Sequence, residues 1–252
     1  MRRQILQNRH KNLQQNISLT LFILYSLSIN IVTAEEVKAL KFTTLEGTPV
    51  QKISESVVRE AYNRMGISIS IKQLPGRRAI AMANAGTFDG EVSRIANIEK
   101  KFTSLIPIKI PINFIEGMVL SKDNPIHIDN WESIKHYKIA IRRGVLFSKK
   151  GTEGMNVQVL NNWKSMLRAL DTGRADVIIM PRTVALKTLN DGKSPNVIIN
   201  EPPIVILPLY HYLHKKRSSL IPQLESTLKK MQTDGTINRI INETRTKLTV
   251  KK

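Results

Sequence analysis

The sequence predicts an α/β protein built from two similar lobes. One pattern, a helix followed by Gly-x-x-Asp and a short strand, occurs at Gly86 and Asp89 and again 87 residues later at Gly173 and Asp176. Each Gly follows a helical pattern, where a left-handed residue commonly ends a helix. Any α/β protein contains such turns singly, but two matching units favour two similar lobes. The expected working surface is the cleft between them, beyond the carboxyl ends of the strands.

The first 34 residues have the composition of a secretory signal peptide. They contain no Asp or Glu, begin with a basic polar run, and continue through the mostly apolar segment 17–32 to Val-Thr-Ala. This order is typical of such peptides, so cleavage is expected after Ala34 and the mature protein is expected in the periplasm. The alternative is an uncleaved membrane anchor, although five Ser, Thr and Asn side chains make the apolar run weak for a spanning helix of about 20 residues.

The mature chain, residues 35–252, is long enough for two small lobes or one large domain and is strongly basic. Four of the 39 basic residues precede Glu35, which leaves 35 against 20 acidic residues and a net charge of +15. Such a charge favours anionic partners: acidic solutes, an anionic membrane or wall surface, or nucleic acid. Export makes nucleic acid the least favoured of these, and aromatic residues make up only 5% of the chain. The sequence has no cysteine, so its core must hold it together without disulfides.

The first mature elements predict a βαβ unit. Residues 37–43 alternate apolar and basic side chains, a helical pattern from Ile53 to Met65 ends at Gly66, and residues 67–71 alternate with period two. A strand, a helix and a strand of these lengths require a right-handed crossover and a largely parallel sheet. The first helix-Gly-x-x-Asp-strand unit follows, and Asp89 and Asp176 are interpreted as strand-start residues that bond their own turns.

The remaining pattern predicts a second lobe inserted between two connecting strands, 113–121 and 209–213, the second of which is bracketed by prolines. Between them we expect helices at 131–137, 147–155, 163–170 and 183–189 and strands at 138–142, 157–160, 177–180 and 197–199; two helices follow the second connector. The predicted division is therefore a first lobe of residues 35–120 and 209–252 and a second lobe of residues 121–208. A hinged pair of lobes of this kind closes on a ligand by rigid-body rotation.

Four stretches in this order resemble the family 3 extracellular solute-binding proteins, which have the type II periplasmic binding protein fold of polar amino acid uptake systems. The stretches are LPGRRAIAMANAGTFDGEVSRI (74–95), WESIKHYKIAIRRG (131–144), LRALDTGRADVII (167–179) and LIPQLESTLKKMQTDGTINRIIN (220–242). The resemblance implies two lobes, each a mixed, mostly parallel sheet flanked by helices. It also implies a monomer that delivers a small solute to an inner-membrane ABC transporter, with no cofactor and no catalytic activity.

The expected pocket departs from that of family members that bind α-amino acids. Those members carry a carboxylate-binding Arg after the first Gly-x-x-Asp strand, whereas here Arg94 stands earlier. They also tend to have an ammonium-binding Asp where this chain has Pro181, followed by Arg182. Losing an anion beside a gained guanidinium argues against an ordinary amino acid. An anionic solute, acidic or phosphorylated, is therefore the expected ligand class.

The candidate ligand-binding residues are mostly arginines near strand ends and helix starts. The arginine fork suits carboxylate or phosphate, and a partly desolvated cleft strengthens such pairs. For each one the plain alternative is a surface or interlobe salt bridge, and Arg78 could simply pack along its helix. Glu46 could orient a ligand hydroxyl or amine. The candidate set is Glu46, Arg78, Arg94, Arg142 and Arg182.

Other functions remain open. A ligand-sensing protein that docks on a membrane receptor would share the same cleft, and a member that has lost its ligand would show the same departures. A dehydratase-like enzyme on this fold would need a general acid, for which only Glu46 and Glu91 are candidates. His211 and His214 are three residues apart on an expected strand, so their side chains face opposite sides and no metal site is expected.

Overall fold

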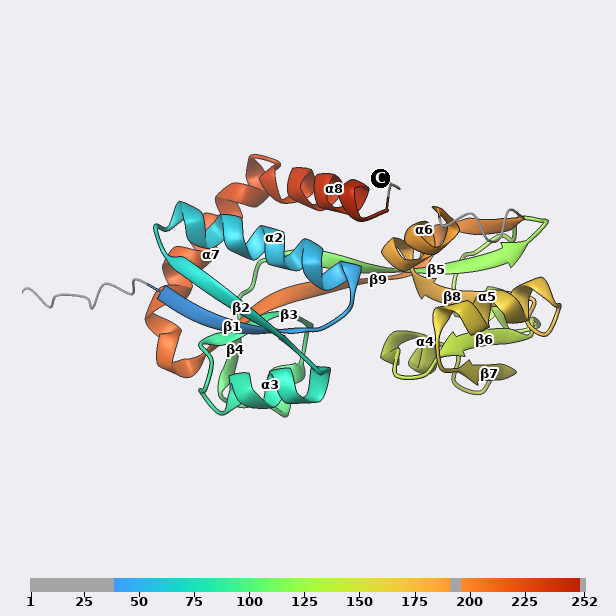
Figure 1. The fold of residues 1–252 in the computed structure, drawn as a ribbon, viewed down its shortest axis with the longest axis horizontal. Helices are drawn as coiled ribbons and strands as arrows, with labels where there is room; N and C mark the ends of the chain where they lie inside the picture. The colour runs from blue at the N-terminus through green and yellow to red at the C-terminus, as the bar shows by residue number, and fades with distance from the viewer. Residues whose placement is uncertain (1–38, 191–195, 250–252) are drawn as a thin grey trace, which may run out of the picture. The chain divides into compact units, whose positions relative to one another are not determined.

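The computed structural model describes residues 39–190 and 196–249, and the predicted signal peptide and its cleavage site lie outside these residues. The described chain is a mixed α/β fold, as the sequence predicts (Figure 1). Its strands form one sheet in the order β2-β1-β3-β9-β5-β8-β6-β7, and β4 pairs with β9. The pairs β1–β2, β1–β3, β6–β7 and β6–β8 are parallel, whereas β9 and β5 pair antiparallel with their neighbours.

The predicted βαβ unit is present as β1 (Ala39–Leu45), α2 (Pro49–Arg64) and β2 (Ser68–Leu74). Thr48 caps α2 by accepting a hydrogen bond from the backbone N–H of Gln51, and Pro49 occupies the first turn, where its missing N–H costs nothing. The apolar face of α2 packs on the sheet, and Gly66, with φ of 71°, turns the chain from α2 into β2.

Both Gly-x-x-Asp turns form as predicted, between α3 (Gly76–Asn84) and β3 (Gly90–Ile95) and between α5 (Trp163–Asp171) and β8 (Val177–Pro181). Gly86 and Gly173 are left-handed, with φ of 78° and 67°. The interpretation that each Asp bonds its own turn is wrong. The Asp89 carboxylate accepts from the backbone N–H of Lys41 at 2.8 Å, and the Asp176 carboxylate accepts from that of Lys138 at 2.8 Å. Each Asp therefore ties its turn to the chain of the neighbouring parallel strand.

Two long strands, β5 (Asn113–Lys122) and β9 (Val197–His214), run side by side in the middle of the sheet (Figure 1). They separate two groups of elements, one around β1, β2 and β3 and the other around β6, β7 and β8. The sequence predicts separate strands at 197–199 and 209–213, but the structure joins them into one. The pairing of β9 with β5 passes from Asn200 to Val205, so the intervening residues, among them Pro202 and Pro203, lie in an irregularity. Proline lacks a backbone donor, and such an irregularity accommodates it within a strand.

Most of the other elements lie close to their predicted positions, although two of the predicted helices are shorter and the short elements at 98–100, 105–107 and 215–220 were not predicted. They are β4 (Leu105–Pro107), β6 (Ile139–Arg142), β7 (Val157–Leu160), α4 (Leu146–Gly151), α6 (Arg182–Asn190), α7 (Ile221–Thr233), α8 (Thr236–Thr249) and the 3-10 helices η1 (Ile98–Lys100), η2 (Trp131–Ile134) and η3 (Lys215–Leu220).

Apolar side chains pack on both faces of the sheet around β8. One cluster includes Met118, Met166 and Leu170 with the α5 and α6 side chains, and the other includes Val119, Ile141 and Ile179. Burial on two faces explains why Val177 to Met180 is continuously apolar rather than alternating. The residue limits of the two lobes stay a prediction.

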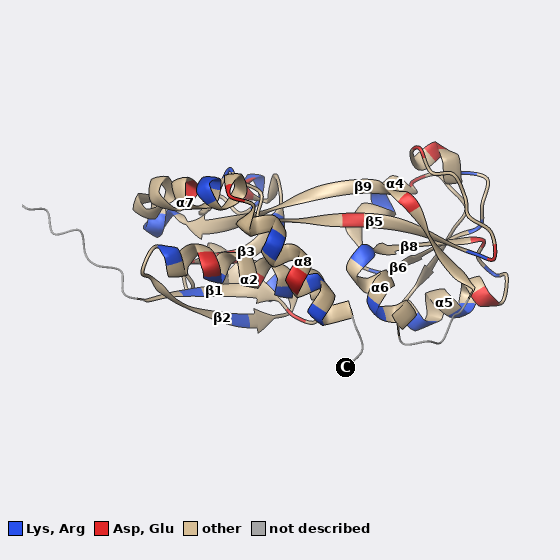
Figure 2. Cartoon of the chain, turned by 90° about the horizontal axis from the view of Figure 1, so that it is seen from above, with Lys and Arg blue, Asp and Glu red and all other residues tan. Residues whose placement is uncertain are grey.

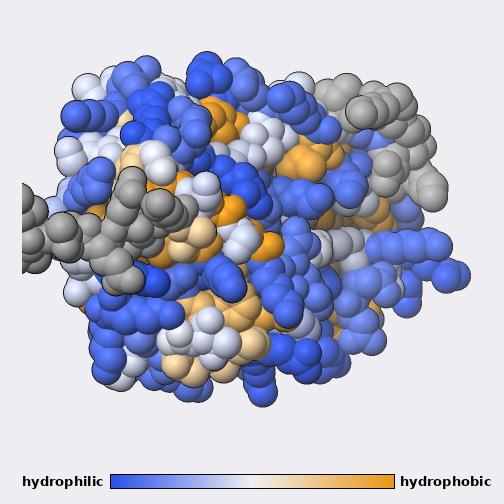
Figure 3. All heavy atoms as spheres, turned by 60° about the vertical axis from the view of Figure 1, so that its left-hand side comes forward, coloured by the Kyte–Doolittle hydropathy of each residue, from blue (hydrophilic) through white to orange (hydrophobic). Residues whose placement is uncertain are grey.

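Basic residues are spread over helices and loops in both groups of elements (Figure 2). The face shown in Figure 3 is mainly hydrophilic, with separate apolar spots rather than one broad patch. No helix among the described residues is both long and apolar enough to cross a membrane.

Candidate functional site

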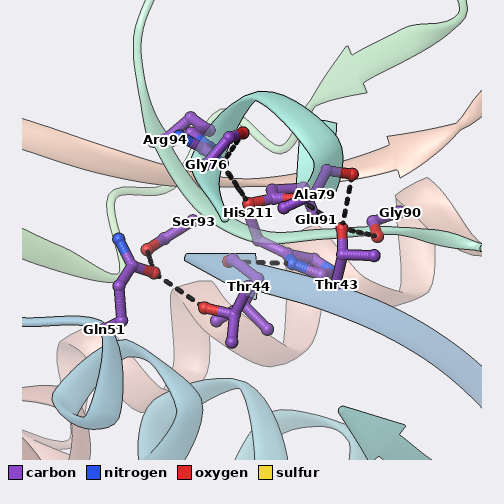
Figure 4. A network of polar contacts seen from close by, with 11 residues as sticks. Thr43, Thr44, Gln51, Gly76, Ala79, Gly90, Glu91, Ser93, Arg94 and His211 are labelled. Carbon is purple, nitrogen blue, oxygen red and sulfur yellow. Dashed lines mark hydrogen bonds and ion pairs between the residues drawn. The ribbon is translucent and has the colours of Figure 1, made fainter. Parts of the chain in front are cut away.

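A buried polar network links the carboxyl-terminal part of β1 with side chains along β3 (Figure 4). Thr43 and Thr44 are adjacent on β1, so their side chains point to opposite faces of the sheet. The Thr44 hydroxyl donates to Gln51 Oε1 at 3.0 Å, and the Ser93 hydroxyl donates to the same oxygen at 2.9 Å. The amide of Gln51 thus fixes α2 to two neighbouring parallel strands on one face.

On the other face lies Glu91, whose side chain is fully buried. One carboxyl oxygen, Oε2, makes a short hydrogen bond with the Thr43 hydroxyl. The other, Oε1, accepts from Arg94. Burial raises the pKa of Glu91, because a charged carboxylate loses its water; the Arg94 charge and the two hydrogen bonds oppose this.

Arg94 is held at three points, and its side chain is 19% exposed. Its Nε and Nη2 lie 3.0 and 2.8 Å from Glu91 Oε1, and Nη2 also donates to the backbone oxygen of Gly76, at the start of α3, at 3.0 Å. Within residues 39–190 and 196–249, Nη1 makes no hydrogen bond. The guanidinium is therefore fixed in place and keeps one nitrogen for a further acceptor.

His211 is a fully buried residue of β9, next to β3. Its Nδ1 is 3.1 Å from the backbone oxygen of Val92, so Nδ1 carries the proton and donates. Its Nε2 accepts from the Tyr62 hydroxyl at 3.0 Å. Burial lowers the pKa of His211 to about 4, so the ring is neutral at neutral pH. Both ring nitrogens are thus used within the core.

Arg142, at the end of β6, is positioned by an aromatic ring rather than by a carboxylate. Its guanidinium lies 4.8 Å from the centre of the Trp163 ring, a cation–π contact, and its Nε is 3.5 Å from the backbone oxygen of Asn161. Neighbouring Arg143 donates from Nε to Asn161 Oδ1 at 3.0 Å. The Trp163 ring restricts the position of the Arg142 guanidinium while the side chain stays partly exposed.

Arg182, in contrast, is occupied by two carboxylates. Its Nε donates to Glu116 on β5 at 3.0 Å, and its Nη1 and Nη2 both bond Glu201 on β9, the latter at 2.8 Å. Arg245 of α8 donates to the second oxygen of Glu116 at 2.9 Å. These bonds match the salt-bridge alternative for Arg182, since they link α6 and α8 to the two long strands.

We expect Arg182→Met to lower the free energy of unfolding by roughly 1 to 3 kcal/mol, because Glu116 and Glu201 lose charged donors. Urea denaturation at neutral pH measures this, with Arg174→Met as the matched control. Arg174 is exposed, and within the described part of the chain its one hydrogen bond is to the neighbouring Thr172 hydroxyl, so its replacement should change little. Equal stability of the two variants would contradict a structural role for Arg182.

The two remaining candidates, Glu46 and Arg78, are exposed. Glu46 follows β1 and Arg78 lies in the first turn of α3. Thus Glu46, Arg78 and Arg94 come from the carboxyl-end side of the β1–β3 sheet, and Arg142 comes from the carboxyl end of β6. Sequence reasoning missed Thr43, Gln51 and Ser93 in the network. The available signal was the pair of adjacent threonines in β1, because alternation along a strand places one of two neighbouring polar side chains on each face.

The sheet order, with two parallel groups of strands joined by β5 and β9, defines the type II periplasmic binding protein fold. No protein-family model matches the chain. An uncharacterized protein of Shewanella oneidensis is 27% identical over 199 residues, which cover 75% of this chain and 74% of that protein.

Solved structures share the fold at low identity. The GluR0 ligand-binding core in complex with L-glutamate is 14% identical, with a TM-score of 0.66, over 81% of this chain and 97% of that one. The second substrate-binding domain of a putative amino acid ABC transporter from Streptococcus pneumoniae is 15% identical, with a TM-score of 0.61, over 81% and 98%. An ancestral amino-acid-binding protein, AncCDT-1, described as a precursor of cyclohexadienyl dehydratase, is 17% identical, with a TM-score of 0.59, over 82% and 94%.

Proposed function

We propose that this chain is a periplasmic solute-binding protein that captures a small polar, anionic solute between its two lobes and delivers it to an inner-membrane ABC transporter. The carrying observation is Arg94, a guanidinium fixed by Glu91 and Gly76 at the carboxyl end of β3 with Nη1 left for a further acceptor. In the proposed division, residues 35–120 and 209–252 form one lobe and 121–208 the other.

Four of the candidate residues make up the proposed solute contacts. Arg94 and Arg142 supply guanidinium groups whose orientation is already set, by an ion pair in one case and by Trp163 in the other, so little side-chain entropy is lost on binding. Arg78, in the same first turn of α3 as Gly76, adds an exposed positive charge, and Glu46 offers a carboxylate for a hydroxyl or amine. Arg182 is left out of these contacts, because Glu116 and Glu201 occupy its guanidinium.

Delivery to a transporter is favoured by the structural neighbours, one of which is a domain of a putative amino acid ABC transporter. Periplasmic location rests on the composition of residues 1–34. A receptor-docking sensor would use the same contacts and differ only in its partner. A dehydratase-like reaction is less favoured, because one of its two candidate acids, Glu91, is fully buried and bonded to Thr43 and Arg94, where it cannot reach a solute. That leaves Glu46 as its remaining candidate.

The test is a thermal-shift screen of residues 35–252 against amino acids, dicarboxylates, tricarboxylates and phosphorylated sugars. A solute at a hundredfold over its dissociation constant stabilises the native state by about 2.7 kcal/mol. For a chain of this size that corresponds to a rise in Tm of roughly 5 to 10 °C. We expect an anionic solute to give this shift.

The variants Arg94→Ala and Arg142→Ala should each remove the shift, whereas the exposed Arg174→Ala should keep it. A shift given only by neutral or cationic solutes would overturn the anionic assignment. If no compound binds, the sensor and ligand-free alternatives gain, and the transport proposal fails.

A further inference from the structure

We infer that Glu91 is an internal counter-ion of Arg94 whose charge the bound anion replaces: when an anion binds Arg94, Glu91 stays in place and takes up a proton from solvent. This inference deepens the proposed function and rests on it in one respect: the bound anion is the solute that the protein captures. The consequence is that one proton is bound together with the anion, so the affinity for an anion rises as the pH falls through the titration of Glu91.

The Glu91 carboxyl group can make its hydrogen bonds in both the ionised and the protonated state. Thr43 Oγ1 lies beside Glu91 Oε2 and also 3.1 Å from the backbone oxygen of Ala79. A hydroxyl has one proton to donate and can also accept. With Glu91 ionised, Thr43 donates to Oε2; with Glu91 protonated, Oε2 donates to Thr43, whose proton turns to Ala79. No buried donor or acceptor of this group is left unpaired in either state, so the switch avoids a desolvation cost.

The coupling arises because one guanidinium serves two acceptors. Arg94 Nε and Nη2 contact Glu91, and the positive charge of Arg94 is the largest influence holding the pKa of Glu91 down against burial. An anion at Nη1 would neutralise that charge without displacing Glu91. A carboxylate that is buried and loses its positive neighbour becomes protonated.

The other groups around Glu91 leave Arg94 as its charged partner. From β1 the facing side chain is Thr43, and from α3 the facing group is the backbone oxygen of Ala79. From β9, Tyr212 is paired with Glu91 in the sheet, and its hydroxyl hydrogen-bonds to the Ile95 backbone oxygen and the Glu99 carboxylate. His211, also on β9, is neutral. Among the described residues, no other ion pair to Glu91 is recorded.

The experiment follows the side-chain carboxyl resonance of Glu91 by carbon-13 NMR as a function of pH, in wild-type protein, with sodium sulfate or with sodium chloride at the same ionic strength. Sulfate keeps its charge over the titration range, and matched ionic strength removes screening differences. Glu91→Gln identifies the signal, and sequential backbone correlations do so if that variant does not fold. We expect sulfate to raise the titration midpoint of Glu91 by at least half a pH unit.

Two variants locate the effect. In Arg94→Gln the midpoint should lie higher in both salts and no longer respond to sulfate, whereas Arg59→Gln, an exposed change on α2, should respond like wild type. An unchanged midpoint in wild-type protein overturns the inference, as does a sulfate response that survives in Arg94→Gln. If the thermal-shift screen finds a solute but the titration midpoint of Glu91 does not change, this inference fails and the proposed function stands. If sulfate shifts the midpoint but the screen finds no solute, the proposed function fails and this inference stands.

Discussion

Replacing Gly90 with alanine is expected to lower the free energy of unfolding by roughly 3 kcal/mol or more. A Cβ atom at Gly90 would lie 2.0 Å from the backbone oxygen of Tyr212 and 3.1 Å from Leu213 Cα. Both neighbours are backbone atoms of β9, which is paired with β3 at this point, so neither can rotate away. Overpacking of this kind costs more than a core side chain that can repack. Because whole domains are stable by about 5 to 15 kcal/mol, much of the margin would be lost.

Urea denaturation of Gly90→Ala beside Gly47→Ala separates this clash from the general effect of the added methyl group. Gly47 has φ of 76° and nothing within 4 Å of its added Cβ, so alanine there meets only the left-handed backbone penalty of about 1 to 2 kcal/mol. A Gly90→Ala variant no less stable than Gly47→Ala would show that β3 and β9 are not packed this closely.

The second large effect is a loss of stability in mild acid that depends on His211. The unfolded ring takes up a proton near pH 6.5, whereas the folded ring does so only near its pKa of about 4. Between these values the unfolded state binds more protons, so stability falls as the pH is lowered. At about 1.4 kcal/mol per pKa unit, the loss from pH 6.5 to 4 is about 3 kcal/mol.

The measurement is the difference in unfolding free energy between wild type and His211→Gln at several pH values. Glutamine does not titrate, so the difference isolates His211 from Glu91. The raised pKa of Glu91 gives the opposite sign, because its contribution weakens as the pH rises above 4.5. A constant difference from pH 7 to 4 would mean that His211 is not buried in the neutral form.

The α/β class and most elements follow from short-range patterns. Helical spacing of apolar residues predicts α5, a left-handed Gly predicts each Gly-x-x-Asp turn, and continuous apolar residues predict β8. These patterns are local, so one sequence carries them. The joining of residues 197–214 into one strand was not predictable, because it depends on the register of β9 against β5, which lies about 80 residues earlier.

For the candidate site, too, some features follow from the sequence and others depend on the tertiary structure. The sequence by itself determined the charge of the chain, the turn glycines and the arginines at strand ends. The tertiary structure alone decided which of those arginines have partners: Glu116 and Glu201 occupy Arg182, the Trp163 ring contacts Arg142, and Glu91 holds Arg94 while leaving Nη1. The physical reason is that a guanidinium can bind a solute or a carboxylate of the same chain. The outcome depends on groups that only folding brings within about 3 Å.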